Sequence, residues 1–153
     1  MTTGVMLNYG QNRLATIALG AQAVDTNLYL ALVFSAATPM VNPAVTDNIG
    51  TNMTEVSGTS YARIAVARNT DWTIVANLAT AATKTFTVGS GGWLKCNGWA
   101  LCASSTPTTA DALFAGAFAS DAANPPYNQQ GSHVAGETIA VTASITFEDV
   151  SQS

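Results

Sequence analysis

The chain has 153 residues, of which only 9% are charged, and its formal net charge at neutral pH is −4. Roughly 25% of an average globular domain is charged, so this surface must be mostly Thr, Ser, Asn and Ala, which favours a protein covered by neighbouring chains. Its five cations are scattered, which argues against nucleic-acid binding, and it has neither an apolar run of membrane-spanning length nor a basic N-terminal signal.

The first predicted element is a helix over about residues 7–19, within LNYGQNRLATIALGAQA. Gly20 is a plausible stop, while Gly10 weakens the pattern. The apolar residues fall near one helical face: Leu7, Leu14, Ile17 and Ala18. We expect this helix either to pack on the end of a β-core or to dock on a neighbouring subunit.

Several strands are predicted next. NLYLALVF at 27–34 is apolar on both faces, which indicates an interior strand. Residues 36–60 are rich in Pro, Gly, Asn and Thr and predict a long contact-making loop. Strands follow in YARIAVAR (61–68), DWTIVA (71–76) and TKTFTV (83–88), which are rich in the β-branched residues that strands prefer.

The stretch GWLKCNGWALCA, which follows a predicted turn at GSGG (89–92), forms either one strand or a two-residue hairpin. In neither geometry do Cys96 and Cys102 come within bridging distance. We therefore interpret both as small buried thiols, and an intracellular assembly compartment is favoured.

The last third contains a strand in ALFAGAF, whose glycine marks a bulge or a close backbone approach. A second long loop at 120–136 precedes ETIAVTASITFE, where apolar and polar residues alternate strictly, as in a half-buried strand. About seven strands and one short helix predict a single all-β domain over residues 1–153. We expect an antiparallel β-sandwich, of which the jelly roll is one form.

The segment TEVSGTSYARIAVAR raises the question of a nucleophilic serine at Ser57 or Ser60. A serine hydrolase needs an oriented base, and His133, the one histidine, lies in a Pro- and Gly-rich loop. The segment lacks the G-x-S-x-G elbow and leads into a strand instead of a helix. We interpret these serines as turn residues.

Other chemical sites find no support in the sequence. One histidine and two separated cysteines cannot close a zinc site, and the acidic residues lack the spacing of a calcium loop. The glycine-rich turn is not followed by the lysine that phosphate cradling needs. We therefore predict a protein that is not an enzyme, with no catalytic residue, cofactor, metal ion or small-molecule substrate.

Candidate contact residues are chosen for loop length and apolar character. Glu55 and Arg63 flank the opening turn, and we expect them to form a structural pair. The aromatic side chains could stack sugars but are more typical of a core or an interface; Tyr127 is the exception because its loop looks exposed. The candidate interface residues are Leu7, Leu14, Ile17, Met40, Met53, Tyr61, Pro125 and Tyr127.

Several blocks together resemble a widespread family of small bacteriophage virion proteins, often labelled tail-fibre or minor structural proteins, with head decoration (cement) proteins among its members or lookalikes. LYLALVFS resembles the family's LYLALF, and TEVSGTSYARIAV resembles TEVSGGSYARQAV. GGWLKCNGWALCAS is similar to its tryptophan-led strand, LFAGAF to LLFYGAL, and GETIAVTASITFE to GDTLSFAAGALTVTL. The resemblance spans about residues 7–147; the TEVSG…YAR block is fairly specific and the rest is generic β-sequence.

The chain also departs from that family. It lacks the acidic residue that usually follows the strand ending at Leu101-Cys102, has a longer loop before Glu137, and ends in the polar tail EDVSQS. These departures concern the surface that meets the virion.

The resemblance implies a virion part that assembles in the host cytoplasm. The chain has no repeat, so it does not suit a fibre shaft, whereas a compact sandwich suits a clamp seated across capsid joints. We therefore expect a capsid decoration protein that stabilises the assembled head. Its partners are the major capsid protein and copies of itself, as dimer or trimer, with no nucleic acid and no membrane. The alternative is a tail- or fibre-associated knob that contacts the host receptor.

Overall fold

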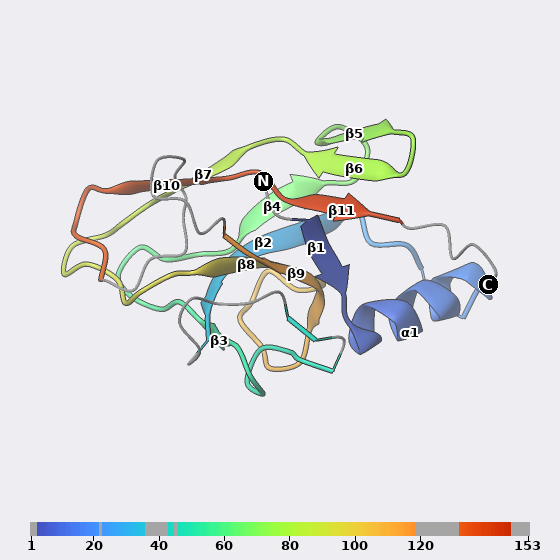
Figure 1. Ribbon diagram of the computed structural model, residues 1–153, viewed down its shortest axis with the longest axis horizontal. Helices are drawn as coiled ribbons and strands as arrows, with labels where there is room; N and C mark the ends of the chain where they lie inside the picture. Colours follow the sequence, from blue (N-terminus) through green and yellow to red (C-terminus); the bar gives the residue numbers. More distant parts are fainter. Residues whose placement is uncertain (1–2, 22, 36–42, 45, 119–131, 148–153) are drawn as a thin grey trace.

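The computed structural model describes residues 3–21, 23–35, 43–44, 46–118 and 132–147. Within them the fold is all-β and sandwich-like with one short helix, as predicted (Figure 1). The elements are β1 (Thr3–Met6), α1 (Asn8–Ala18), β2 (Asn27–Phe34), β3 (Thr54–Glu55), β4 (Ile64–Ala67), β5 (Trp72–Val75), β6 (Leu78–Ala81), β7 (Lys84–Thr87), β8 (Gly98–Cys102), β9 (Ala112–Ala117), β10 (Thr138–Val141) and β11 (Ser144–Thr146).

The strands form one nine-stranded sheet and one two-stranded sheet. The order in the larger sheet is β3-β2-β8-β9-β1-β11-β6-β5, with β4 pairing with β2 beside β3. The smaller sheet pairs β10 with β7. Among the named strands that the structure describes, all pairs are antiparallel except β1 with β11. The sandwich is therefore mixed and not purely antiparallel.

Strand β1 joins the two halves of the larger sheet. Its first residues, Thr3 and Gly4, pair with β11, and its last residues, Val5 and Met6, pair with β9. Among the described strands, each half thus continues into the other only through these four residues. As a result, the sheet folds into two layers, with β2, β8 and β9 facing β5, β6, β11 and the β7–β10 pair (Figure 1).

The main core fills the space between these layers. It combines apolar side chains from β2 and β8 with those from β7, β10 and β11, all nearly inaccessible to water. Burying each such side chain contributes about 1.5–3 kcal/mol. The largest contributors are Leu30, Leu32, Phe86, Trp99, Leu101, Ile139, Val141 and Ile145.

A second cluster covers the other face of β2. Ala31 and Val33 point to this face, opposite Leu30 and Leu32, and they are fully buried beneath Ile49. Strand β2 is therefore buried on both faces, which confirms the interior strand predicted from its uninterrupted apolar sequence.

The indole of Trp99 lies across two glycines on adjacent strands. A Cβ atom at Gly116 of β9 would lie 2.9 Å from two Trp99 ring atoms, and a Cβ at Gly4 of β1 would also clash with this ring. The glycine of ALFAGAF therefore marks a close approach, as predicted, but it is the Trp99 side chain that approaches its backbone. A register shift between Leu101 and Cys102 marks a bulge in the same pairing.

The segment ETIAVTASITFE is not the single strand that its alternation predicts. It divides into β10, which pairs with β7, and β11, which pairs with β6 and β1. Ile139, Val141, Ala143 and Ile145 are nevertheless all buried, whereas Phe147 is exposed. Alternation reports which face of a strand meets the core, and it carries no information about a change of partner.

Helix α1 matches the predicted range closely and packs on the β-core, one of the two alternatives expected, but it does so through Gly10 and not through the predicted apolar face. Leu7 caps the helix with an extended backbone and is fully buried. Gly10 is the buried residue of the helix itself, because a Cβ there would meet the backbone of Leu113. The glycine that weakened the sequence pattern thus allows α1 to pack closely on β9.

Candidate functional site

Glu55 and Arg63, paired in the sequence prediction, are in direct contact in the structure. Glu55 ends β3 and Arg63 directly precedes β4. Arg63 Nε donates to Glu55 Oε1 at 2.9 Å, and its Nη2 donates to Oε2 at 2.7 Å. This two-point geometry is the strong form of an arginine–carboxylate pair.

Asp111, which sequence reasoning missed, completes a buried network. Arg63 Nη1 donates to Asp111 Oδ2 at 2.5 Å and Nη2 donates to Oδ1 at 3.1 Å, while Nη1 also donates to the carbonyl of Ser104 at 2.7 Å. All five guanidinium N–H groups thereby have acceptors. Burial alone would lower the pKa of Arg63, but the hydrogen bonds that it donates to Glu55 and Asp111 outweigh this effect and raise its pKa further above the ordinary value. Arg63 therefore stays charged inside the protein.

Tyr61 extends this network into β2. Its hydroxyl donates to Glu55 Oε1 and accepts from the backbone N–H of Leu32, both at 3.0 Å. The ring stacks on Phe86 and meets Trp93 edge-on, with centroids 6.1 and 5.3 Å away. Burial, followed by the charge of Glu55, raises the pKa of Tyr61 well above 10. The hydroxyl fills the gap between β4 and β3 along the edge of β2, which is a structural role.

The residues considered for serine chemistry do not form a catalytic pair. Ser60 is exposed in a turn with φ of 63°, and Tyr61 N–H closes this turn on Gly58. His133 is only 5% exposed and exchanges two backbone hydrogen bonds with Trp93. Its Nδ1 lies 2.9 Å from Glu137 Oε1 without hydrogen-bond geometry, and neither ring nitrogen has a hydrogen-bond partner in the part of the chain that the structure describes.

The two cysteines are free and buried, as predicted. Burial raises the pKa of Cys96 to about 12, so this thiol is neutral at physiological pH. Burial, together with the nearby Asp111 carboxylate, also raises the pKa of Cys102. Buried, protonated thiols of this kind are poor nucleophiles.

The described residues contain neither a metal-ligand cluster nor a membrane-spanning helix. No group of three or more His, Cys, Asp or Glu side chains within the ranges given above is arranged to hold a metal ion. None of the helical segments described is both long enough and apolar enough to cross a bilayer.

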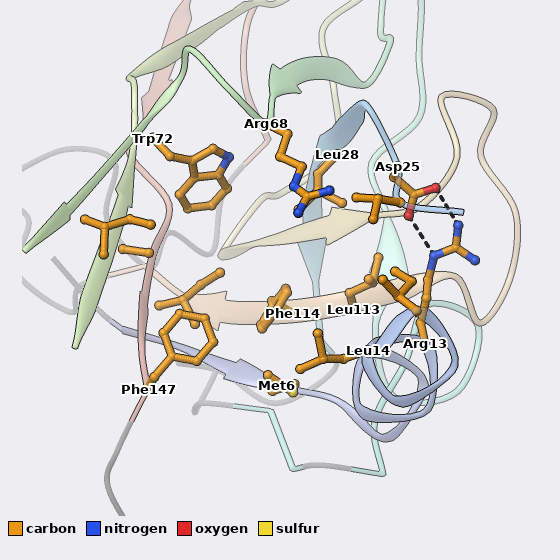
Figure 2. A pocket seen from close by; sticks show the side chains of 16 residues that line it. Met6, Arg13, Leu14, Asp25, Leu28, Arg68, Trp72, Leu113, Phe114 and Phe147 are labelled. Atoms are coloured by element: carbon orange, nitrogen blue, oxygen red, sulfur yellow. Dashed lines mark hydrogen bonds and ion pairs between the residues drawn. The ribbon is translucent and has the colours of Figure 1, made fainter. Parts of the chain in front are cut away.

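The second candidate site is an apolar groove of about 280 Å³ (Figure 2). It lies where the two layers part, because Leu28, Trp72 and Phe114 on its walls also pack against the main core. Helix α1 supplies another wall. The apolar residues that line it are Met6, Leu14, Ile17, Val24, Leu28, Trp72, Ile74, Ala79, Leu113, Phe114, Ile145 and Phe147.

Exposed apolar side chains gather at this groove. Ile74 is 71% exposed, Leu14 53% and Phe147 47%. Val75 and Leu78, also exposed, face each other at the end of the neighbouring β5–β6 hairpin. Scattered exposed apolar residues are normal, but a contiguous group of them marks an interaction surface.

Three charged side chains border the groove. Arg13 donates from Nε and Nη2 to the two carboxylate oxygens of Asp25, at 2.7 and 2.5 Å. This contact raises the pKa of Arg13. Arg68 has no such partner among the described carboxylates. In Figure 2 its guanidinium lies between Trp72 and Leu28 and points towards the groove.

The predicted interface residues have different locations. Leu7 and Met53 are buried inside the chain, so they belong to the core and the prediction of a contact role for them is wrong. Leu14 and Ile17 line the groove, and Tyr61 is half-buried in the Arg63 network. Three others lie outside the described residues: Met40, Pro125 and Tyr127.

Sequence reasoning also missed Arg68, Trp72 and Ile74 as groove residues. In the sequence, Trp72 and Ile74 alternate with Asp71, Thr73 and Val75, a pattern that any surface strand shows. Nothing local indicates that Leu14, 54 to 60 positions earlier in the chain, lines the same groove.

Comparisons with known proteins add no relative. No family model matches the chain, and neither any curated protein nor any solved structure matches it. The resemblance of the TEVSGTSYARIAV block to virion proteins therefore remains a prediction from the sequence.

Proposed function

We propose that this chain is a structural protein of a bacteriophage virion that decorates the assembled head and stabilises it through non-covalent contacts. The observation that carries the proposal is the groove with its exposed apolar rim, on a molecule with only 9% charged residues. Covering such a surface with another polypeptide is favourable, because removing apolar area from water contributes about 25 cal/mol per Å² to the free energy of association. The resemblance of the TEVSG…YAR block supports a virion as the place where this happens.

Decoration requires only modest affinity at each site. A closed shell repeats one contact by symmetry, so small contributions add over the whole particle. A protein that binds the assembled shell and not the free subunit stabilises the shell by mass action. The buried Arg63 network suits this role, because it joins β2, β3, β4 and the start of β9 into one body.

The abundance of the chain in purified particles tests the proposal. We expect a copy number comparable to that of the major capsid protein, measured by quantitative gel densitometry or mass spectrometry. A few copies per particle would support the tail- or fibre-associated knob instead. Absence of the chain from particles that are otherwise complete would contradict both functions.

A binding experiment tests the stabilising role directly. Heads that lack the chain should take it up from solution and then release their genome at a higher temperature. Heads incubated with an unrelated protein of similar acidity serve as the control. Uptake without any rise in the release temperature would contradict a cement role.

A further inference from the structure

We propose that the groove binds one extended segment of the capsid subunit, mainly apolar and carrying a carboxylate, which adds to β5 as a further strand. The identity of the partner as a capsid subunit rests on the proposed function. The chemistry of the segment comes from the edge of β5, from the faces of its side chains and from the charge on Arg68.

The edge of β5 is open. This strand ends the order of the larger sheet and, among the described residues, pairs only with β6. Its outer backbone N–H and C=O groups can therefore accept another strand. Ile74 and Val75, 71% and 67% exposed, make this an apolar edge without the charged side chains that usually protect one. An edge of this kind is normally covered in its working state.

The side chains of β5 direct an added strand over the groove. Trp72 and Ile74 alternate with Thr73, and both line the groove. Alternate side chains of an added strand would face the same side and extend this apolar surface. Backbone pairing would supply affinity, and the groove would select apolar residues at alternate positions.

Arg68 specifies an acid on the incoming segment. Arg13 is neutralised by both oxygens of Asp25, whereas Arg68 forms no ion pair with any carboxylate in the described ranges. Its guanidinium points into apolar surroundings between Trp72 and Leu28 (Figure 2). Because Arg68 is exposed, a carboxylate on the added strand could reach it and form a charge-assisted pair, which the bound segment would then shield from water.

Two other occupants fit less well. A second copy joined through the same surface would bring its own Arg68 and an Asp25 already engaged by Arg13, so the described residues that line its groove offer no unpaired carboxylate. A fatty acid would satisfy Arg68 and the apolar wall but would leave the edge of β5 unpaired.

Peptide binding tests the proposal on the whole chain. The probe is a capped, fluorescein-labelled seven-residue peptide of alternating threonine and valine, with glutamate in place of the central valine; the matched peptide has lysine there. We expect the wild-type chain to bind the glutamate peptide about tenfold more tightly, equivalent to about 1.4 kcal/mol. Arg68→Glu should reverse this preference, and Ile74→Asp should weaken both peptides.

Val134→Asp provides the matched control. Val134 is 70% exposed, as Ile74 is, but it lies near the Trp93–His133 bridge and not in the groove. This variant should bind both peptides as the wild type does, and circular dichroism confirms that each variant is folded. Failure of the wild type to bind at millimolar peptide, or a preference unchanged by Arg68→Glu, overturns the proposal.

Two other results would also overturn the proposal. If the chain forms a dimer that Ile74→Asp dissociates, the groove binds a second copy. If the chain binds laurate but neither peptide, the groove binds a fatty acid. Head-binding assays separate this inference from the proposed function. Arg68→Glu and Ile74→Asp should fail to join heads that Val134→Asp joins. If all three variants join, the groove proposal fails while decoration stands.

Discussion

Arg63 is one cation facing two carboxylates in a site closed to water. Its side chain has no exposed surface, and those of Glu55 and Asp111 are 7% and 9% exposed. Removing charges from water is costly, and the pairing and five hydrogen bonds offset that cost. The arrangement therefore depends on Arg63 far more than on either carboxylate, because without it two negative charges would remain buried together.

We expect Arg63→Met to destabilise the protein by about 3–5 kcal/mol, since it leaves buried charges without a partner. Urea unfolding at neutral pH measures the change. Arg68→Met is the matched control, because Arg68 is exposed and its loss should change stability by no more than about 0.5 kcal/mol. Equal effects of the two substitutions would contradict the structural role of Arg63.

The sequence allowed half of this network to be predicted. Glu55 and Arg63 are eight residues apart at either end of one turn, in a chain where charges are rare. Asp111 lies 48 residues from Arg63 and comes close only because β9 is two strands from β2 in the sheet. Such a contact depends on strand order, which no local pattern encodes.

Among the strands, periodicity predicted burial better than it predicted pairing. The apolar run of β2 indicated two buried faces, and the alternation in 137–148 indicated one. The same alternation concealed the division between β10 and β11. Strands β1 and β6 were missed because TGVM and LATA are short and contain small residues with weak strand preference.

The stacking of Trp99 on glycine gives a prediction for β8 and β9. Gly116→Ala should destabilise the protein by about 1–3 kcal/mol, because its new methyl group would overlap the indole ring. In a Trp99→Phe background, where the side chain is smaller, Gly116→Ala should destabilise the protein clearly less than it does in the wild type. A double-mutant cycle in urea measures this coupling. Additive effects would show that the ring and the glycine do not constrain each other.

At the scale of the whole molecule, β1 is the strand that joins the half-sheet ending in β9 to the half-sheet beginning with β11. Four residues near the N-terminus lie between β9 and β11, and Leu7 continues the contact through a 2.8 Å hydrogen bond to the carbonyl of Leu113. The fold class was predictable from composition and alternation. The position of β1 was not, because a parallel partner about 140 positions away leaves no trace in a short sequence window.

Hydrogen exchange tests this central position. Chain ends usually fray, yet amides within residues 3–7 should exchange as slowly as those of β8 and far more slowly than those of the exposed helix α1. Mass spectrometry of native-state exchange, followed by peptic digestion, resolves these segments. Protection of residues 3–7 no greater than that of α1 would show that the half-sheets are joined in another way.

The same strand constrains when the molecule can mature during synthesis. The ribosome makes β1 well before either of its neighbours, β9 and β11. The nascent chain must therefore carry Val5 and Met6 unpaired until β9 has left the exit tunnel. Because such long-range closure is slow, a chaperone that shields nascent N-termini should raise the yield of folded protein.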